Sequence, residues 1–214
     1  MKRLAGVLAL LCGIASAATA QTAAARRGDR GTVSLRASIG VFAPVSPLVA
    51  FENGTDADLD LQAGSAFGLE LNWMIADGFG LYAGSTGLIS RVNHSTALLT
   101  EGPSRTTSQV TVLLHSGGFI LAPRIGRLGF RPMLRLGAGV KFYDFELTEV
   151  TNGVRGFTGD LGIGLSGGLG PVSFVSEARW ILSEFDPAVL PVPVPSGPKQ
   201  RQNDWLLMMG FRYS

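Results

Sequence analysis

The chain contains little of what metal centres and disulfide-stabilised folds require. Its 214 residues include one cysteine, Cys12, and two histidines. A site built from cysteine and histidine ligands would need more of both, and a single cysteine cannot form an internal disulfide. We therefore expect no bound metal, no cofactor and no disulfide framework.

Charge and long apolar runs are scarce as well. Charged residues make up 16% of the chain, which is low for a soluble domain. The mean hydropathy is nevertheless +0.28, and no run reaches the roughly 18 apolar residues that a membrane-spanning helix needs. A β-barrel explains both observations, because its apolar residues alternate with polar ones and form no long run.

The N-terminal segment has the pattern of a secretory signal peptide. Lys2 and Arg3 precede an apolar stretch at residues 4–14, and Ala18-Thr19-Ala20 offers a cleavage site of small residues. The apolar stretch is too short to serve as a membrane anchor. We therefore expect residues 1–20 to be removed when the protein is exported.

Cleavage would leave a flexible lead-in at residues 21–31 and a single exported domain at residues 32–214. It would remove Cys12, so the mature domain would have to be stabilised without a disulfide. It would also lower the 18 basic residues to 16, equal to the 16 acidic ones. A neutral mature chain has no electrostatic basis for binding nucleic acid, and we expect none to bind.

Residues 129–145 show the pattern that recurs along the chain. Their apolar side chains occupy alternate positions, and the positions between them carry cations and glycines. The apolar set is Phe130, Leu134, Leu136, Ala138, Val140 and Phe142; the other set is Arg131, Met133, Arg135, Gly137, Gly139, Lys141 and Tyr143. This period of two is typical of a β-strand with two chemically different faces, and no helix sorts the residues in this way.

Eight segments alternate in this manner and are predicted strands. They are residues 32–42, 63–75, 79–91, 108–122, 129–145, 154–169, 172–182 and 204–213. In the fourth, Val110, Val112 and Leu114 are assigned to the apolar face opposite Thr111 and His115, and Gly117-Gly118 is a candidate bulge. The connections alternate between long and short, which places all the long ones at one end of the sheet.

Together these features predict an all-β fold, an eight-stranded antiparallel up-and-down transmembrane β-barrel. The chain resembles the small outer-membrane β-barrel family of the OmpA transmembrane-domain and OmpX kind over residues 32–213. The resemblance implies insertion in the outer membrane, contact with its lipid, a monomer, and recognition of the C-terminal strand by the barrel-assembly machinery. Members of the family usually end on an aromatic residue, whereas here Tyr213 is followed by Ser214.

The two faces predict two sets of structural residues. The lumen of an eight-stranded barrel is narrow enough for side chains to fill, and charges buried there must pair. The predicted lumen charge network is Arg36, Glu70, Arg131, Arg135, Lys141, Asp160, Glu177, Arg179, Asp204 and Arg212. The predicted aromatic girdle is Trp73, Phe79, Phe130, Phe142, Tyr143, Phe157, Phe174, Trp180, Trp205, Phe211 and Tyr213. Arg135 and Lys141 are six residues apart on one strand, so they are expected to pair at different depths.

No catalytic residues are predicted, and the function favoured is a structural or surface-interaction barrel with a plugged lumen. Three alternatives stay open. They are a narrow channel for small solutes, a lipid-modifying enzyme, and a soluble lipocalin-like periplasmic barrel with its apolar face inside. His94-Ser95 and His115-Ser116 lack the His-x-Ser spacing of barrel lipid A deacylases, and adjacent strand residues point to opposite faces. No surface ligand is predicted for the long connections.

Overall fold

The computed structural model describes residues 30–48, 60–95, 105–124, 130–145, 154–169, 171–186 and 200–214. The predicted signal peptide lies outside these residues. The strands are β1 (Val33–Pro44), β2 (Asp60–Leu61), β3 (Gly64–Ala76), β4 (Phe79–Ser95), β5 (Arg105–Leu121), β6 (Phe130–Phe145), β7 (Val154–Leu169), β8 (Val172–Phe185) and β9 (Gln200–Tyr213). Within the described part of the chain, no helix is long and apolar enough to cross a membrane.

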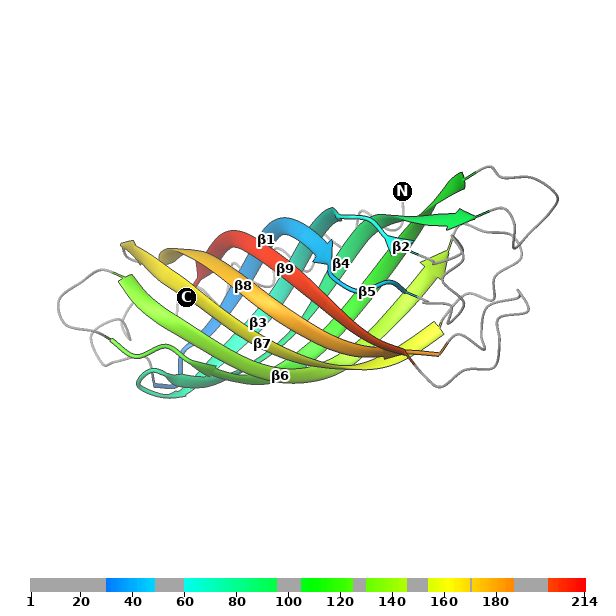
Figure 1. Cartoon of the computed structure of the whole chain (residues 1–214). Coiled ribbons are helices and arrows are strands. Elements are labelled where there is room, and N and C mark those ends of the chain that lie inside the picture. Colours follow the sequence, from blue (N-terminus) through cyan, green and yellow to red (C-terminus); the bar gives the residue numbers. More distant parts are fainter. Residues whose placement is uncertain are drawn as a thin grey trace, which may run out of the picture.

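Eight long strands form one closed antiparallel sheet, in the order β4-β3-β1-β9-β8-β7-β6-β5, and β5 pairs back to β4. The pairing of β1 with β9 joins the two ends of the domain. The short β2 adds only Asp60 and Leu61 against the end of β4. Figure 1 shows the strands inclined to the long axis of the barrel. The predicted eight-stranded all-β barrel is confirmed.

Several strands extend further than the alternation indicates. β7 matches its predicted range, whereas β4, β5, β8 and β9 continue by several residues toward the long connections. The outward side chains of the β8 and β9 extensions are polar, as at Glu184 and Arg201. Alternation of apolar and polar residues therefore ends before the backbone pairing does, because pairing requires no apolar side chain.

Two predictions about β5 are wrong. Its register with β4 and β6 is continuous through Gly117-Gly118, and a register shift lies instead between Met74 and Ala76 in β3. Val112 and Leu114 point into the lumen, while His115 lies on the outer wall. Near the long connections both faces of β5 carry apolar residues, so hydrophobicity alone does not distinguish them.

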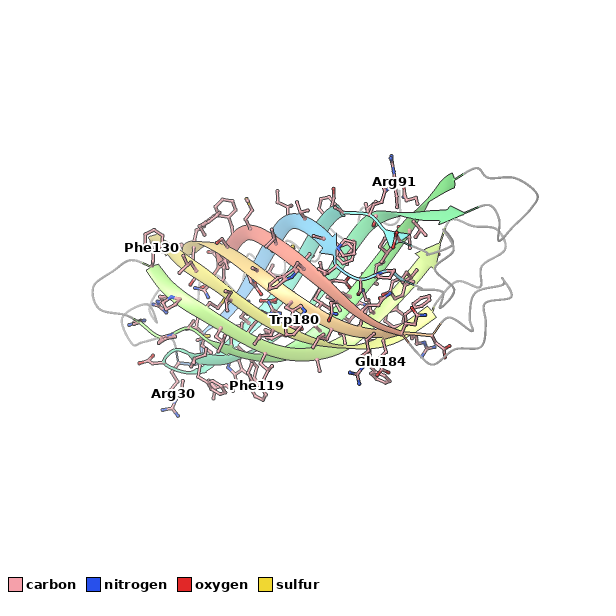
Figure 2. All side chains as sticks on the ribbon, in the orientation of Figure 1. Arg30, Arg91, Phe119, Phe130, Trp180 and Glu184 are labelled. Atoms are coloured by element: carbon pink, nitrogen blue, oxygen red, sulfur yellow. The ribbon has the colours of Figure 1, made fainter. Side chains whose placement is uncertain are left out.

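The outer wall is apolar along the middle of the strands. Large side chains such as Leu136 and Ile163 are about 60% exposed there, at 59% and 62%. Charged side chains mark the two ends of the wall. Figure 2 shows Arg91 and Glu184 toward one end and Arg30 and Phe130 toward the other. An apolar band between polar rims is the surface that a bilayer requires.

Most of the predicted girdle residues lie on this outer wall, and Tyr143 does not. Phe157 and Phe130 are among the most exposed, Phe142 is partly exposed, and Phe174 packs edge-on against Phe211 with ring centroids 5.9 Å apart. Tyr143 is 0% exposed and points into the lumen. Because Phe142 and Tyr143 are consecutive strand residues, they cannot both face the lipid.

A charge introduced on the apolar band tests the assignment of the two faces. We expect Leu136→Arg to lower the free energy of unfolding by about 2–4 kcal/mol, since it places an arginine in hydrocarbon. Thr111→Arg, on the outer wall beside Gln109 at the polar rim, is the control and should cost about 0–1 kcal/mol. Urea unfolding of barrels refolded in lipid vesicles measures both. Equal stability of Leu136→Arg and the parent would mean that the faces are wrongly assigned.

Candidate functional site

A cluster of ion pairs fills the middle of the lumen. Arg135 Nη1 lies 2.7 Å from Glu70 Oε2 and 3.0 Å from Glu177 Oε1. Arg179 contacts the same two carboxylates, at 3.0 Å from Glu70 and 2.6 Å from Glu177. Arg36 pairs with Glu177 as well and lies 3.8 Å from Glu70. Each of these side chains is at most 6% exposed, so every charge depends on its neighbours for the solvation that water would supply.

Asp160 and Tyr82 complete this cluster. Asp160 Oδ1 lies 3.4 Å from Arg135 Nε. The Tyr82 hydroxyl contacts the Asp160 carboxylate at 2.9 and 3.0 Å, and the Arg135 guanidinium lies 3.7 Å from the centroid of the Tyr82 ring. The cluster therefore contains three arginines and three carboxylates and is formally neutral.

A second, smaller polar layer lies nearer the long connections. Lys141 Nζ is 2.6 Å from Asp204 Oδ2 and 3.4 Å from Ser183 Oγ. Tyr143 donates a hydrogen bond to Gln202, whose Oε1 lies 3.4 Å from Ser183 Oγ. Arg135 and Lys141 thus pair with different acids at different depths, as their spacing predicts.

Apolar side chains lie on both sides of the central cluster. On the side of the long connections, buried apolar side chains surround the second polar layer and include Phe42, Leu88, Val112, Leu114, Ile181 and Leu206. Leu48 and Leu61, from opposite ends of the β1–β3 connection, are buried in the same cluster. On the side of the short turns, a second cluster contains Ile120, Ala122, Met133, Val175 and the Tyr82 ring. The charged layer is therefore enclosed by apolar residues at both ends.

Close contacts show how little room is left around the charges. A Cβ atom added at Gly137 would lie 1.7 Å from Tyr82 Oη, and one at Gly162 would lie 2.5 Å from Arg135 Cγ. Neither position could hold even alanine unless a neighbouring side chain moved. The glycines of the lumen face thus provide the space that the large charged side chains occupy.

Eight of the ten charged residues assigned to the lumen from the sequence lie in the two polar layers. The remaining two, Arg131 and Arg212, are half-buried near the short turns. Sequence reasoning missed the apolar layers and the roles of Tyr82, Gln202 and Ser183. The available signal was the loss of alternation at residues 112–114, 181–182 and 206–207, where consecutive residues are apolar.

A polar pair lies on the outer wall, within the apolar band. Ser85 and His115 are direct cross-strand partners of β4 and β5. Ser85 Oγ lies 2.7 Å from His115 Nδ1, and the His115 ring packs edge-on against Phe142 with centroids 5.7 Å apart. The sequence pointed only to the adjacent Ser116 as a neighbour of His115. Ser85 was missed because cross-strand partners are set by strand register, which the sequence does not show.

A nucleophilic catalytic site contains a serine hydrogen-bonded to a histidine. It also needs a group that orients the histidine and an oxyanion hole. In the described part of the chain His115 contacts no carboxylate that would orient it. The strands around the pair are joined by continuous ladders, which occupy the backbone N–H groups that an oxyanion hole would need. Among the described residues, the pair therefore has neither the orienting carboxylate nor the free backbone donors that acyl transfer uses.

Comparison with known proteins supports the fold. OprG from Pseudomonas aeruginosa, an outer membrane protein, matches with a TM-score of 0.57 and 17% identity over 87% of this chain and 96% of that one. Neisserial surface protein A matches with a TM-score of 0.54 and 12% identity over 85% and 96%. No protein-family model and no curated protein sequence matches this chain. The chain thus has the fold of the small eight-stranded outer-membrane barrels.

Removing one carboxylate from the central cluster tests how strongly the charges depend on one another. Glu177 contacts Arg36, Arg135 and Arg179, so we expect Glu177→Gln to lower the free energy of unfolding by about 3–5 kcal/mol. Glu184→Gln is the matched control on the exposed face of the same strand and should change it by less than about 0.5 kcal/mol. Denaturant midpoints in vesicles measure both; similar midpoints would show that the cluster contributes little.

Proposed function

We propose that this protein is an integral outer-membrane β-barrel with a closed lumen and a structural or surface-interaction role. The observation that carries the proposal is the enclosure of a neutral charge cluster between two apolar layers, within a wall that is apolar outside. A soluble lipocalin-like barrel would need the opposite arrangement, with its apolar residues inside and its charges in water. The signal peptide predicted at residues 1–20 supports export from the cytoplasm.

The filled lumen argues against the channel alternative. An ion would have to displace Arg36, Arg135 and Arg179 from their carboxylates and then cross the apolar layer around Leu206. Breaking such buried pairs is costly, because each separated charge would remain in a region of low dielectric constant. Any binding specificity of this barrel is therefore assigned to its outer surfaces, including the four long connections at one end.

Fractionation of a Gram-negative host tests the location. We expect the mature protein to sediment with the outer membrane and to remain there after a urea wash, because the apolar band holds it in lipid. A peripheral protein expressed in the same cells serves as the control for the wash. Recovery of the folded protein in the soluble periplasmic fraction would contradict the proposal.

Electrical recording tests the closed lumen. Purified protein in planar bilayers should show no large steady conductance, since side chains occupy the bore. Glu184→Gln serves as the control, because its side chain lies on the outer wall. Robust single-channel currents, with an ion selectivity that shifts in Glu177→Gln without loss of stability, would show that the charges line an aqueous path.

A further inference from the structure

The hydrogen bond between Ser85 and His115 lies on the outer wall, near the middle of the apolar band. The two residues are cross-strand partners of β4 and β5, strands that lie side by side in Figure 1. Exposed apolar side chains continue on both sides of the pair, at Ile89 and Leu113 toward the long connections and at Phe119 toward the short turns. Ionisable side chains that face the interior of a membrane are rare and costly, and they mark functional positions.

The pair satisfies only part of its own hydrogen-bonding capacity. If Ser85 donates to His115 Nδ1, the hydrogen on Nε2 and a lone pair on Oγ stay free; if Nδ1 donates, the hydroxyl hydrogen and Nε2 stay free. In the described part of the chain, His115 otherwise contacts only the ring of Phe142. Either position of the proton therefore leaves the pair with one unused donor and one unused acceptor, which is costly in hydrocarbon.

The bilayer itself supplies no partner for these groups at this depth. Its hydrocarbon has no hydrogen-bonding groups, and the polar parts of its lipids lie at the two interfaces. Another membrane-spanning protein can place a polar side chain at mid-depth. A second copy of this chain does so necessarily, because two barrels inserted in the same orientation hold Ser85 and His115 at the same depth.

The wall around the pair is built from small residues. Ala83 and Gly87 flank Ser85 along the outer face of β4, and Gly117 follows His115 on the outer face of β5. A Cβ atom added at Gly87 would meet no atom within 4 Å, so the packing of the barrel does not itself require glycine there. Small residues at interfaces within membranes let two backbones approach closely, and polar side chains then form hydrogen bonds across the contact.

We propose that the protein forms a two-fold symmetric dimer in the outer membrane through a contact patch made of Ala83, Ser85, Gly87, His115 and Gly117. A two-fold axis along the membrane normal exchanges left and right on the facing walls, so His115 of each copy lies opposite Ser85 of the other. Two hydrogen bonds then join the copies, each between Nε2 of one and Oγ of the other. Every side-chain N–H and O–H of the two pairs then has an acceptor, whichever ring nitrogen carries the proton.

The same patch serves on both copies, so the contact closes at two barrels and does not extend into a filament. Two convex barrels touch over only a few strands, and the strength of such a small contact depends on its hydrogen bonds. The inference departs from the monomer that the resemblance to OmpA-type barrels implies. It rests on the proposed outer-membrane location, because in water the unused donor and acceptor would be satisfied by solvent.

Förster resonance energy transfer between barrels in lipid vesicles tests the dimer. The predicted mature chain, residues 21–214, has no cysteine, so Arg30→Cys on the exposed short-turn end provides one labelling site per barrel. Donor-labelled and acceptor-labelled copies are refolded together at decreasing ratios of protein to lipid. We expect more transfer than randomly distributed barrels would give, with the linear dependence on acceptor fraction that a dimer produces.

Two substitutions remove the hydrogen bonds and keep the patch apolar and compact. His115→Phe and Ser85→Ala should each raise the dissociation constant of the dimer about tenfold, as the loss of two hydrogen bonds within a membrane predicts. The double variant should be no weaker than either single variant, because each single change already removes both bonds.

A matched pair of tryptophan substitutions locates the interface. Ala83→Trp places a bulky side chain within the patch and should reduce the transfer to that of randomly distributed barrels. Ala178→Trp introduces the same side chain on the outward face of β8, which is separated from β4 and β5 by at least two strands in either direction. It should change the dissociation constant less than twofold. Gel mobility with and without heating verifies that each variant is folded.

Each contrary result has its own meaning. Random transfer in the wild type would overturn the dimer, and unchanged dissociation constants in His115→Phe and Ser85→Ala would overturn the hydrogen-bonded contact. Equal effects of Ala83→Trp and Ala178→Trp would overturn the patch as the interface. A different outer-membrane protein recovered one-to-one from cells, and lost in Ala83→Trp, would replace the second copy as the occupant. Failure of the outer-membrane proposal would appear instead in the cell fractionation, whereas failure of the dimer leaves that result unchanged.

Discussion

Backbone hydrogen bonding within hydrocarbon is the constraint on which the rest of this structure depends. A membrane-spanning strand has no water to satisfy its N–H and C=O groups, so each strand must pair on both sides. The β1–β9 and β4–β5 ladders meet this requirement by closing the sheet. Closure at eight strands leaves an interior of side-chain width. Whatever faces inward must then pack and pair as the core of a soluble protein does.

The interior does so by grouping its charged side chains and its apolar side chains in separate layers. Arg36, Arg135 and Arg179 share carboxylates that come from three other positions in the barrel, and Lys141 has Asp204. Apolar clusters on both sides keep water from competing with these pairs. The same arrangement underlies the proposal of a closed lumen, because the charges that might attract a solute are already paired with one another.

The outer wall is less uniform than a lipid-facing surface needs to be. Hydrophobic side chains alone would suffice for insertion, yet Ser85 and His115 form a hydrogen bond within the apolar band, and Ser85 also lines a groove beside Leu69 and Ala37. A polar pair is costly in hydrocarbon, so its presence there favours the proposal that this barrel functions through its surfaces and not through its bore.

The sequence by itself determined the strands, their number and the separation of the two faces, because the period of two is a local property of the extended backbone. It also showed that Arg135 and Lys141 need separate partners. Only the tertiary structure decided which carboxylates those are, since Arg36 and Glu177 meet across 141 residues of sequence. Register likewise paired Ser85 with His115, turned Val112 inward and placed Tyr143 in the lumen. Alternation specifies that neighbours differ in face; closure of the sheet specifies which residues meet.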